Sequence, residues 1–306
     1  MEKDIIFTGI RHLKDQKSLE VKEKIEKIAH LNTNVLIYGE TGVGKDFWVY
    51  HLYQISGADK LLNLNCGDVP ETLLESEWFG YKQGAFTGAN RDYEGKWKHA
   101  RDGILFLNQI DLLSINLQSR LLRIIERKKY FPLGSNQEQT IDARFIFSAD
   151  SNIEDKVRSG EFRQDLFYRI SAYKIHIPPL RERKKDILPL VLHFAKKAGL
   201  KVAISRKGIK RLKTYRWGGN IREIESFINN VSISRSELVD EDIYDLHLKA
   251  MDLLDTMKDS DLSLLQLERE YIFYLLKKYR SKVKVADILK ISRKSLYNKL
   301  KKYEDH

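Results

Sequence analysis

Gly39-Glu40-Thr41-Gly42-Val43-Gly44-Lys45-Asp46 joins the apolar run Val35–Tyr38 to a segment of helical pattern that starts near Phe47. Glycines at the first and sixth positions let backbone N–H groups turn inward, and Lys45 adds a point charge. The N-terminal end of the following helix also favours an anion. The stretch therefore predicts a phosphate cradle between a strand and a helix. Asp46 stands where a Ser or Thr hydroxyl usually meets magnesium.

The composition is that of an ordinary globular protein, and the net positive charge indicates an acidic partner. The 306 residues are enough for two or three domains, each with its own core. The net charge of +11 favours nucleic acid as the partner. Met1-Glu2-Lys3-Asp4 begins no apolar signal region, and no run approaches the ~18 apolar residues of a membrane span. We therefore expect a cytoplasmic protein without a membrane partner, and the single cysteine, Cys66, excludes an internal disulfide framework.

Short apolar runs alternate with helical patterns in the first part of the chain. The expected strands are Val35–Tyr38, Leu61–Asn65, Gly103–Leu107 and Ala143–Ala149, and the expected helices include Leu19–Leu31, Phe47–Ile55 and Leu117–Arg127. This alternation predicts an α/β fold with a doubly wound parallel sheet over residues 1–177. From Asp186 to Arg235 the pattern is helical throughout, which predicts a small helical domain over residues 178–239. Residues 240–262 are acidic and read as a linker.

Residues 263–306 carry the pattern of a helix-turn-helix. A short apolar helix ends near Leu289, and Ser292 is suited to cap a last helix whose Leu296, Leu300 and Tyr303 face inward. We expect the lysines of that helix to meet phosphates and Arg293, Ser295 and Asn298 to reach base edges of double-stranded DNA. The candidate DNA-binding residues are Ser292, Arg293, Lys294, Ser295, Asn298 and Lys299. The alternative is a solvated basic face on a helical bundle.

Gly84-Ala85-Phe86-Thr87-Gly88-Ala89 places an apolar tip on a flexible stem, which suits a contact with a partner protein. At this hexapeptide the chain resembles the sigma-54-dependent bacterial enhancer-binding proteins, the NtrC-like AAA+ transcription activators. The resemblance runs from about Phe7 to Tyr303. It implies that residues 84–89 contact the sigma-54 factor and hence RNA polymerase. It also implies an AAA+ P-loop fold with a helical lid and a C-terminal Fis-type helix-turn-helix.

The resemblance assigns further roles. ATP and Mg²⁺ are the implied cofactors, and an acidic residue at position 46 is normal in this family, so Asp46 is a candidate magnesium ligand. Asn65 matches the residue that couples the hallmark loop to the nucleotide, and Arg222 matches a nucleotide-contacting arginine of the lid. Arg163 and Arg169 match arginine fingers that reach a neighbouring subunit's nucleotide in a ring, for which a hexamer is expected.

The family's usual N-terminal receiver or sensory domain has no counterpart in these residues. We therefore expect control to come from a separate partner, from the expression level, or from a region outside this sequence.

The sequence departs from the family where hydrolysis is expected. Asn108 and Gln109 occupy the Walker B position, where the family has aspartate and glutamate, and Ala149-Asp150 replaces Thr-Asn at the first sensor. The amides carry no negative charge and take no proton, and loss of a positioned general base costs ~10²–10⁴ in rate. The candidate catalytic residues are thus Asn108, Gln109, Asp150, Arg163 and Arg169, with hydrolysis expected to be weak or absent.

Three explanations compete for these departures. Asn108 and Gln109 are substitutions introduced to trap an ATP-bound ring, or marks of a natural regulator that hydrolyses ATP poorly, or a change compensated by Asp150 on the neighbouring strand. The changes at Asp150, at Lys98, where the family usually has an acidic residue, and at Gly218, where it has proline, favour the second explanation. The third predicts ATPase activity that Asp150→Asn abolishes.

Two functions follow. The leading one is a DNA-tethered, ATP-binding ring protein that acts on sigma-54 RNA polymerase. The runner-up is a hydrolysis-deficient DNA-binding regulator that uses ATP as an allosteric ligand. Another P-loop machine, such as a loader or helicase, is disfavoured by residues 84–89 and by the terminal helix-turn-helix.

Overall fold

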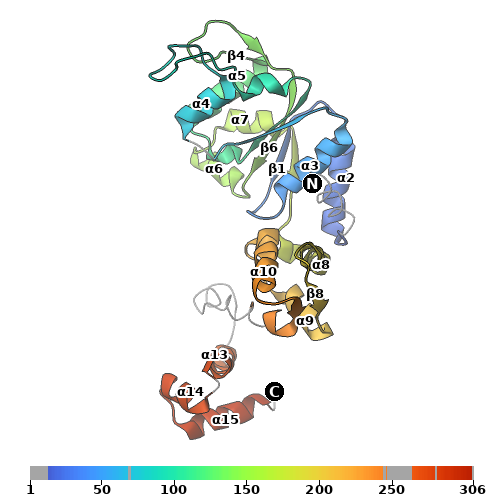
Figure 1. Cartoon of the computed structure of the whole chain (residues 1–306), viewed down its shortest axis with the longest axis vertical. Coiled ribbons are helices and arrows are strands. Elements are labelled where there is room, and N and C mark those ends of the chain that lie inside the picture. The colour runs from blue at the N-terminus through green and yellow to red at the C-terminus, as the bar shows by residue number, and fades with distance from the viewer. Residues whose placement is uncertain (1–12, 68–69, 244–245, 247–263, 280, 305–306) are drawn as a thin grey trace. The chain divides into compact units, whose positions relative to one another are not determined.

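A computed structural model describes residues 13–67, 70–243, 246, 264–279 and 281–304 (Figure 1). The chain divides into two compact units, Met1–Leu238 and Val239–His306. Most of the predicted acidic linker, residues 240–262, lies outside the described residues, as does the start of the family resemblance near Phe7. The predicted boundaries of the four segments stay predictions.

A five-stranded sheet forms the centre of the first unit, with the strand order β2-β3-β6-β1-β7. Its strands are β1 Val35–Tyr38, β2 Leu61–Asn65, β3 Gly103–Asn108, β6 Ala143–Ala149 and β7 Tyr173–His176. Each neighbouring pair is parallel, which confirms the predicted doubly wound α/β fold. Because parallel strands end at one edge, the segments after β1, β2, β3 and β6 meet there.

Helices cover both faces of this sheet (Figure 1). Successive side chains of a strand point to opposite faces, so Ile104 and Phe106 pack with α2 and α3, while Leu105 and Leu107 pack with the helices of the other face. The helices of the first face are α2 Gln16–Ile28 and α3 Lys45–Ser56; those of the second are α4 Glu71–Phe79, α5 Ile115–Arg127, α6 Ile153–Ser159 and α7 Gln164–Ile170. Among the described residues, no helix is long and apolar enough to cross a membrane.

The lid follows the sheet and is built on three helices, α8 Ile187–Lys197, α9 Arg206–Thr214 and α10 Asn220–Ser234. The prediction of an entirely helical segment is wrong at one place. Gly199, with a φ of 71°, ends the turn after α8, and β8 Lys201–Ala203 then pairs with β9 Glu237–Val239. Trp217 anchors the lid core, because its side chain is fully buried and its indole N–H donates to the carbonyl of Leu212 at 2.9 Å.

The second unit contains the helices α13 Leu264–Tyr279, α14 Lys282–Ile288 and α15 Arg293–Glu304. Ser292 Oγ accepts a hydrogen bond from the Ser295 amide at 3.0 Å, so it caps α15 as predicted. Leu296, Leu300 and Tyr303 of α15 are buried against α13 and α14. The inward face expected from the sequence is therefore present.

Two isoleucines of α10 give a matched test of the lid core. Ile228 is fully buried and Ile233 is 84% exposed. We expect Ile228→Ala to lower the free energy of unfolding by about 2–5 kcal/mol, since it removes buried methylenes and leaves a cavity. Ile233→Ala should change it by less than about 0.5 kcal/mol. Urea unfolding followed by far-UV circular dichroism measures both, and equal losses in the two variants would contradict this packing.

Candidate functional site

The P-loop, residues 39–46, connects the end of β1 to the start of α3. Gly42 and Gly44 have φ values of 79° and 94°, a region that favours glycine. A Cβ on Gly42 would lie 2.3 Å from the carbonyl oxygen of Gly219, so a side chain there would displace the lid. The eight predicted ATP-binding residues of this stretch thus form a single turn at the carboxyl edge of the sheet.

Lys45 is the cation of this turn. Its Nζ donates to the carbonyl oxygens of Gly39 at 2.6 Å and Glu40 at 3.2 Å. Burial lowers the pKa of Lys45, and three carboxylates oppose that effect, in decreasing order Asp150, Asp111 and Asp46. The turn fits a polyphosphate, because its lysine is held by carbonyls of its own loop and its glycines leave the backbone uncovered.

The start of α10 closes over the P-loop. The Ile221 amide donates to the Gly42 carbonyl at 2.9 Å, and the Asn220 side chain donates to the Thr41 carbonyl at 3.0 Å. Arg222, the predicted lid arginine, is the next residue, and its charge acts on Asp46 and Lys45. The structure therefore brings Arg222 to the same site as the P-loop.

Two arginines at the start of the lid also hold the P-loop. Arg181 forms a bidentate ion pair with Glu40, at 2.8 and 2.6 Å, and thereby lowers the pKa of the Glu40 carboxyl. Arg183 is buried and donates to the Val43 carbonyl at 2.6 Å; desolvation lowers its pKa to about 10. Sequence reasoning identified this segment as the start of the lid but assigned these arginines no role. Glu40, an acidic residue at the second position of the P-loop, was the sequence feature that could have indicated a basic partner.

Asn108 is the last residue of β3, and its side chain hydrogen-bonds to Asp46 of the P-loop and to Ser148 of β6. Its Nδ2 donates to Asp46 Oδ1 at 3.1 Å, and its Oδ1 accepts from the Ser148 hydroxyl. Desolvation raises the pKa of Asp46, while Lys45 and the Asn108 amide lower it. An amide at position 108 can donate to that carboxylate, whereas a second carboxylate would repel it.

Gln109 follows in a left-handed backbone conformation, with a φ of 59°, and its amide donates to Ser148 Oγ at 3.0 Å. Asn65, at the end of β2, pairs in register with Asn108, and its Oδ1 accepts from the Gly67 amide at 3.1 Å. The predicted coupling residue therefore lies on the strand next to the Walker B position. Its role in coupling stays a prediction.

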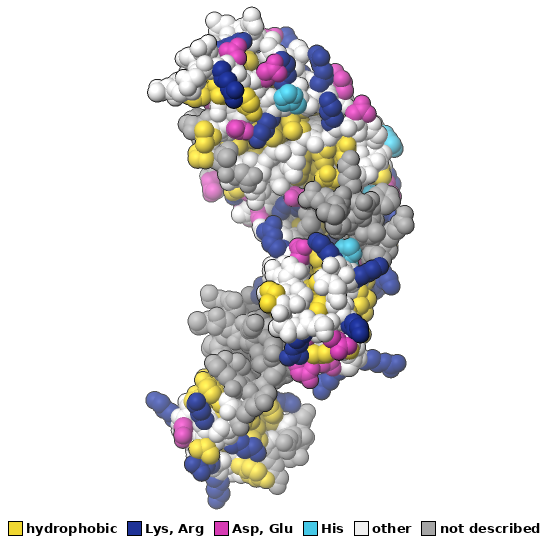
Figure 2. Space-filling view, viewed as in Figure 1, with side chains coloured by type: hydrophobic (Ala, Val, Ile, Leu, Met, Phe, Trp, Pro, Cys, Tyr) yellow, Lys and Arg dark blue, Asp and Glu magenta, His cyan; other side chains and the backbone are white. Residues whose placement is uncertain are grey.

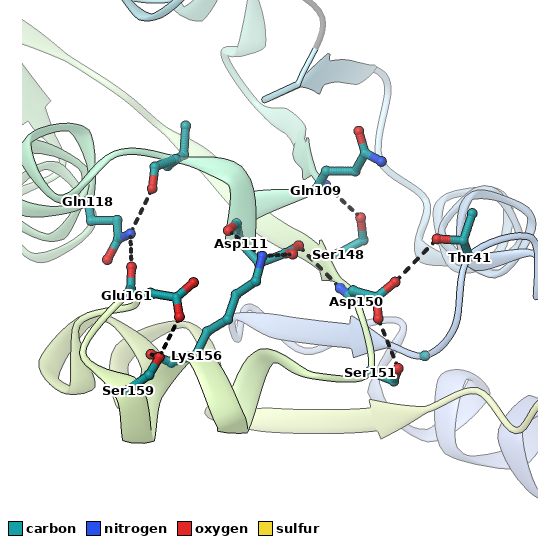
Figure 3. A network of polar contacts seen from close by, with 12 residues as sticks. Thr41, Gln109, Asp111, Gln118, Ser148, Asp150, Ser151, Lys156, Ser159 and Glu161 are labelled. Carbon is teal, nitrogen blue, oxygen red and sulfur yellow. Dashed lines mark hydrogen bonds and ion pairs between the residues drawn. The ribbon is translucent and has the colours of Figure 1, made fainter. Parts of the chain in front are cut away.

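A polar network joins the end of β6 to the P-loop and to α6 (Figure 3). Thr41 Oγ1 donates to Asp150 Oδ2 at 3.2 Å, and the Asp150 amide donates to Asp111 Oδ1 at 3.2 Å. Lys156 Nζ lies 2.8 Å from Asp111 Oδ2. Asp150 was predicted at this site, whereas Asp111 and Lys156 were missed, since nothing in the sequence pairs Asp111, just after β3, with a residue of α6 that lies 45 positions later.

A cavity of about 250 Å³ lies beside Lys45. It is lined by Thr41, Lys45, Gln109, Asp111, Leu112, Asp150, Asn152 and Lys156. The P-loop, the Walker B position and the first-sensor position thus share one space. A second cavity, of about 280 Å³, is lined by residues that include Gly103 and Ala143, the first residues of β3 and β6. It therefore lies at the edge of the sheet away from the P-loop, and no P-loop residue lines it. Within the described ranges, no three His, Cys, Asp or Glu side chains form a group that could hold a metal ion.

The two predicted arginine fingers lie at the start and in the last turn of α7. Arg163 precedes the helix and forms a bidentate ion pair with Asp165, at 3.0 and 2.7 Å, which lowers the pKa of Asp165. Arg169 is exposed near its end. Neither arginine lines the cavity beside Lys45. The structure therefore does not bring them to the P-loop of their own chain.

Residues 84–89 form a tight turn in which Phe86 and Thr87 are exposed and Ala89 is buried. Gly84 and Gly88 have φ values of 81° and 100°, and the Gly84 amide donates to the Ala89 carbonyl at 3.0 Å. Phe86 is 45% exposed and its ring lies 4.9 Å from that of Tyr81. A large apolar side chain is thus presented to solvent from a turn that glycines make possible.

The outer face of α15 carries three of the predicted DNA contacts, Arg293, Lys294 and Asn298, as exposed side chains. Tyr297, which sequence reasoning left out, is 62% exposed on the same helix. Two other predicted contacts have partners within the unit: Lys299 pairs with Glu268 at 2.7 Å, and the Ser295 hydroxyl lies 2.9 Å from that of Ser292. In the view of Figure 2 the charged side chains drawn on this unit are mainly Lys and Arg.

Comparison with known families agrees with these features. Residues 12–176, more than half of the chain, match the sigma-54 interaction domain. The chain belongs to the sigma-54 interaction domain family. Residues 181–257 match the AAA+ ATPase lid domain and residues 263–303 the bacterial regulatory protein, Fis family. The resemblance predicted from residues 84–89 to the sigma-54-dependent enhancer-binding proteins is therefore confirmed.

Relatives within this family are regulators. The regulatory protein LuxO of Vibrio cholerae is 39% identical over 222 residues, which are 70% of this chain and 42% of LuxO. The anaerobic nitric oxide reductase transcription regulator NorR of Aliivibrio fischeri is 39% identical over 232 residues, 73% of this chain and 45% of NorR. The chain thus spans less than half the length of these relatives.

Solved structures show the same fold. The crystal structure of NtrX from Brucella abortus in complex with ATP matches with a TM-score of 0.68 at 24% identity, over 94% of this chain and 68% of NtrX. This likeness concerns the fold.

The contact between Asn108 and Asp46 predicts the effect of placing at position 108 the aspartate that the resemblance leads us to expect there. In the absence of Mg²⁺ and nucleotide, we expect Asn108→Asp to lower the free energy of unfolding by about 1–3 kcal/mol, because it replaces a hydrogen bond to a carboxylate by repulsion. Asn63→Asp, on exposed Asn63 of β2, is the matched charge change and should cost less than about 0.5 kcal/mol. Urea unfolding tests both, and an unchanged Asn108→Asp variant would refute the contact.

Proposed function

We propose that this chain is an ATP-binding, DNA-binding transcription regulator that acts on sigma-54 RNA polymerase in the cytoplasm. The observation that carries ATP binding is the enclosure of the P-loop by the lid, through Ile221 on Gly42 and Arg181 on Glu40. The backbone amides of residues 42–45 and the Lys45 ammonium would hold the phosphates. Arg222 would reach them from the lid.

Magnesium would be held through Asp46 and the phosphate oxygens. This ion keeps several waters and commonly takes one or two protein carboxylates, so the site does not need a cage of acids. Its chemistry would be to neutralise charge on the phosphates. Asn108 donates to Asp46, and this supports a site that tolerates the loss of the Walker B aspartate.

Residues 84–89 would contact the sigma factor. Exposed Phe86 on a glycine-hinged turn supports this role, and Asn65 on β2 would couple the loop to the nucleotide. Arg163 and Arg169 would contact the nucleotide of a neighbouring subunit, since neither lines the cavity of its own chain. The arrangement implies a closed ring, with a hexamer as the expected form.

The exposed face of α15 would bind double-stranded DNA. Arg293, Lys294 and Asn298 would enter the major groove, where an Asn side chain pairs with adenine and Arg with guanine. Lys299 would contribute less, since Glu268 already neutralises it. Ser292 and Ser295 would act chiefly by holding the start of the helix.

A second candidate function is a hydrolysis-deficient regulator that uses ATP as an allosteric ligand and competes or co-assembles with an active relative. Asn108 and Gln109 favour it, because neither amide can serve as a general base. The two candidates differ in whether ATP turnover drives promoter opening.

Restoring the acids at both positions tests this proposal. We expect Asn108→Asp combined with Gln109→Glu to raise the ATPase kcat by up to ~10²–10⁴-fold, the contribution of a positioned acid or base. Hydrolysis is measured beside open-complex formation on a sigma-54 promoter, for the unaltered chain and for the variant. Lys45→Ala in each background is the control and should abolish hydrolysis.

Open complexes formed by the unaltered chain with ATP support the leading function. Open complexes formed by the restored variant alone support the allosteric regulator. A lack of nucleotide binding and of promoter response in both proteins would overturn the proposal.

A further inference from the structure

The cavity beside Lys45 contains two carboxylates with different surroundings. The Asp111 side chain is 4% exposed, and both of its oxygens are engaged within the chain: Oδ1 accepts from the Asp150 amide at 3.2 Å and Oδ2 accepts from Lys156 Nζ at 2.8 Å. An anion that is buried and doubly hydrogen-bonded in this way is a structural group. Asp111 is therefore not available to a substrate.

Asp150 is half-buried and lies on the other side of the same network (Figure 3). Its oxygens accept from two hydroxyl groups, Thr41 Oγ1 at 3.2 Å and Ser151 Oγ at 2.9 Å. Hydroxyl donors rotate, so they can yield these oxygens to a water molecule. Of the three carboxylates that act on Lys45, Asp150 acts most strongly. Asp150 also lines the cavity beside Lys45, so its carboxylate lies next to the region where the P-loop would hold the terminal phosphate.

We propose that Asp150 supplies the carboxylate that the Walker B position lacks, and that the Asp111–Lys156 ion pair positions it. This inference rests on the proposed binding of ATP at the P-loop. Asp150 orients the attacking water and accepts the proton that this water loses as its oxygen bonds to the γ-phosphorus. The bond from that phosphorus to the β–γ bridging oxygen breaks, and ADP and inorganic phosphate are released.

Lys156 performs two tasks in this arrangement. Its ammonium neutralises Asp111, which would otherwise place a second negative charge one hydrogen bond away from Asp150 and repel phosphate. Lys156 Nζ also donates to the Asp111 carbonyl at 3.0 Å, so α6 is tied to the short 3-10 helix η2 Ile110–Leu112. The backbone amide of Asp150 is then held by an acid whose own position is fixed.

The same helix offers a matched control. Asp155 and Arg158 of α6 form an i,i+3 ion pair whose side chains are 69% and 71% exposed. Removing the cation of this pair leaves its carboxylate in water, and exposed pairs of this kind contribute little. Arg158→Met therefore changes an ion pair on α6 without touching the cavity.

The experiment uses the full chain and four variants: Asp150→Asn, Lys156→Met, Lys156→Arg and Arg158→Met. Three quantities are measured for each: kcat and KM of ATP hydrolysis, the equilibrium affinity for a fluorescent N-methylanthraniloyl ATP analogue with Mg²⁺, and the thermal transition by far-UV circular dichroism. The affinity reports nucleotide binding independently of turnover.

We expect the unaltered chain to hydrolyse ATP slowly and Asp150→Asn to lose ~10²-fold or more in kcat, with the analogue bound within ~3-fold of the unaltered affinity. Lys156→Met should lower kcat at least ~10-fold with little change in KM, Lys156→Arg should restore most of the rate, and Arg158→Met should match the unaltered chain. If Lys156→Met lacks a cooperative transition, Lys156→Gln takes its place. Gln keeps a donor for Asp111 without the charge, and the same fall in kcat is expected.

Each of three results would overturn the inference and leave the proposed function intact. The first is that the unaltered chain binds the analogue but does not hydrolyse ATP. The others are an unchanged kcat in Asp150→Asn, or the same kcat in Lys156→Met and Arg158→Met. Failure of the unaltered chain to bind the analogue would instead overturn the proposed function, and this inference with it.

Discussion

The approach of Gly42 to Gly219 is the constraint on which the site depends. A Cβ on Gly42 would lie 2.3 Å from the Gly219 carbonyl oxygen, and the Gly42 carbonyl accepts the Ile221 amide at 2.9 Å. The start of α10 can therefore sit against the P-loop where position 42 has no side chain. This contact fixes the lid over the turn and brings Arg222 near Lys45 and Asp46.

The distribution of charge within the site follows from this enclosure. Asn108 is neutral and donates to Asp46, so the pair is stable without a metal ion between two acids. Asn108 and Gln109 give the end of β3 no negative charge, but the carboxylate of Asp150, which follows β6, lines the same cavity. Lys156 cancels the charge of buried Asp111. In the proposed function, binding of a polyphosphate and activation of water would therefore rest on different residues, and substitutions could separate them.

Sequence predicted the parts of the fold that local pattern encodes. The continuous apolar runs of β3 and β6 predicted strands that are buried on both faces, and Ser292 predicted the start of α15. β7 was not predicted, because Tyr173–His176 has one fully buried apolar residue, Ile175, and lies at the sheet edge. In the site, motif spacing identified the P-loop and the altered Walker B position, whereas the Asp111–Lys156 pair joins elements that meet only through the tertiary fold.

In the proposed function, ATP binds without the Walker B acids. Isothermal titration calorimetry of ATP with Mg²⁺ tests it most directly, on the unaltered chain and on the variant that combines Asn108→Asp with Gln109→Glu. We expect both proteins to bind ATP with dissociation constants within ~10-fold of each other, a difference below about 1.4 kcal/mol. Binding by the restored variant alone would contradict it.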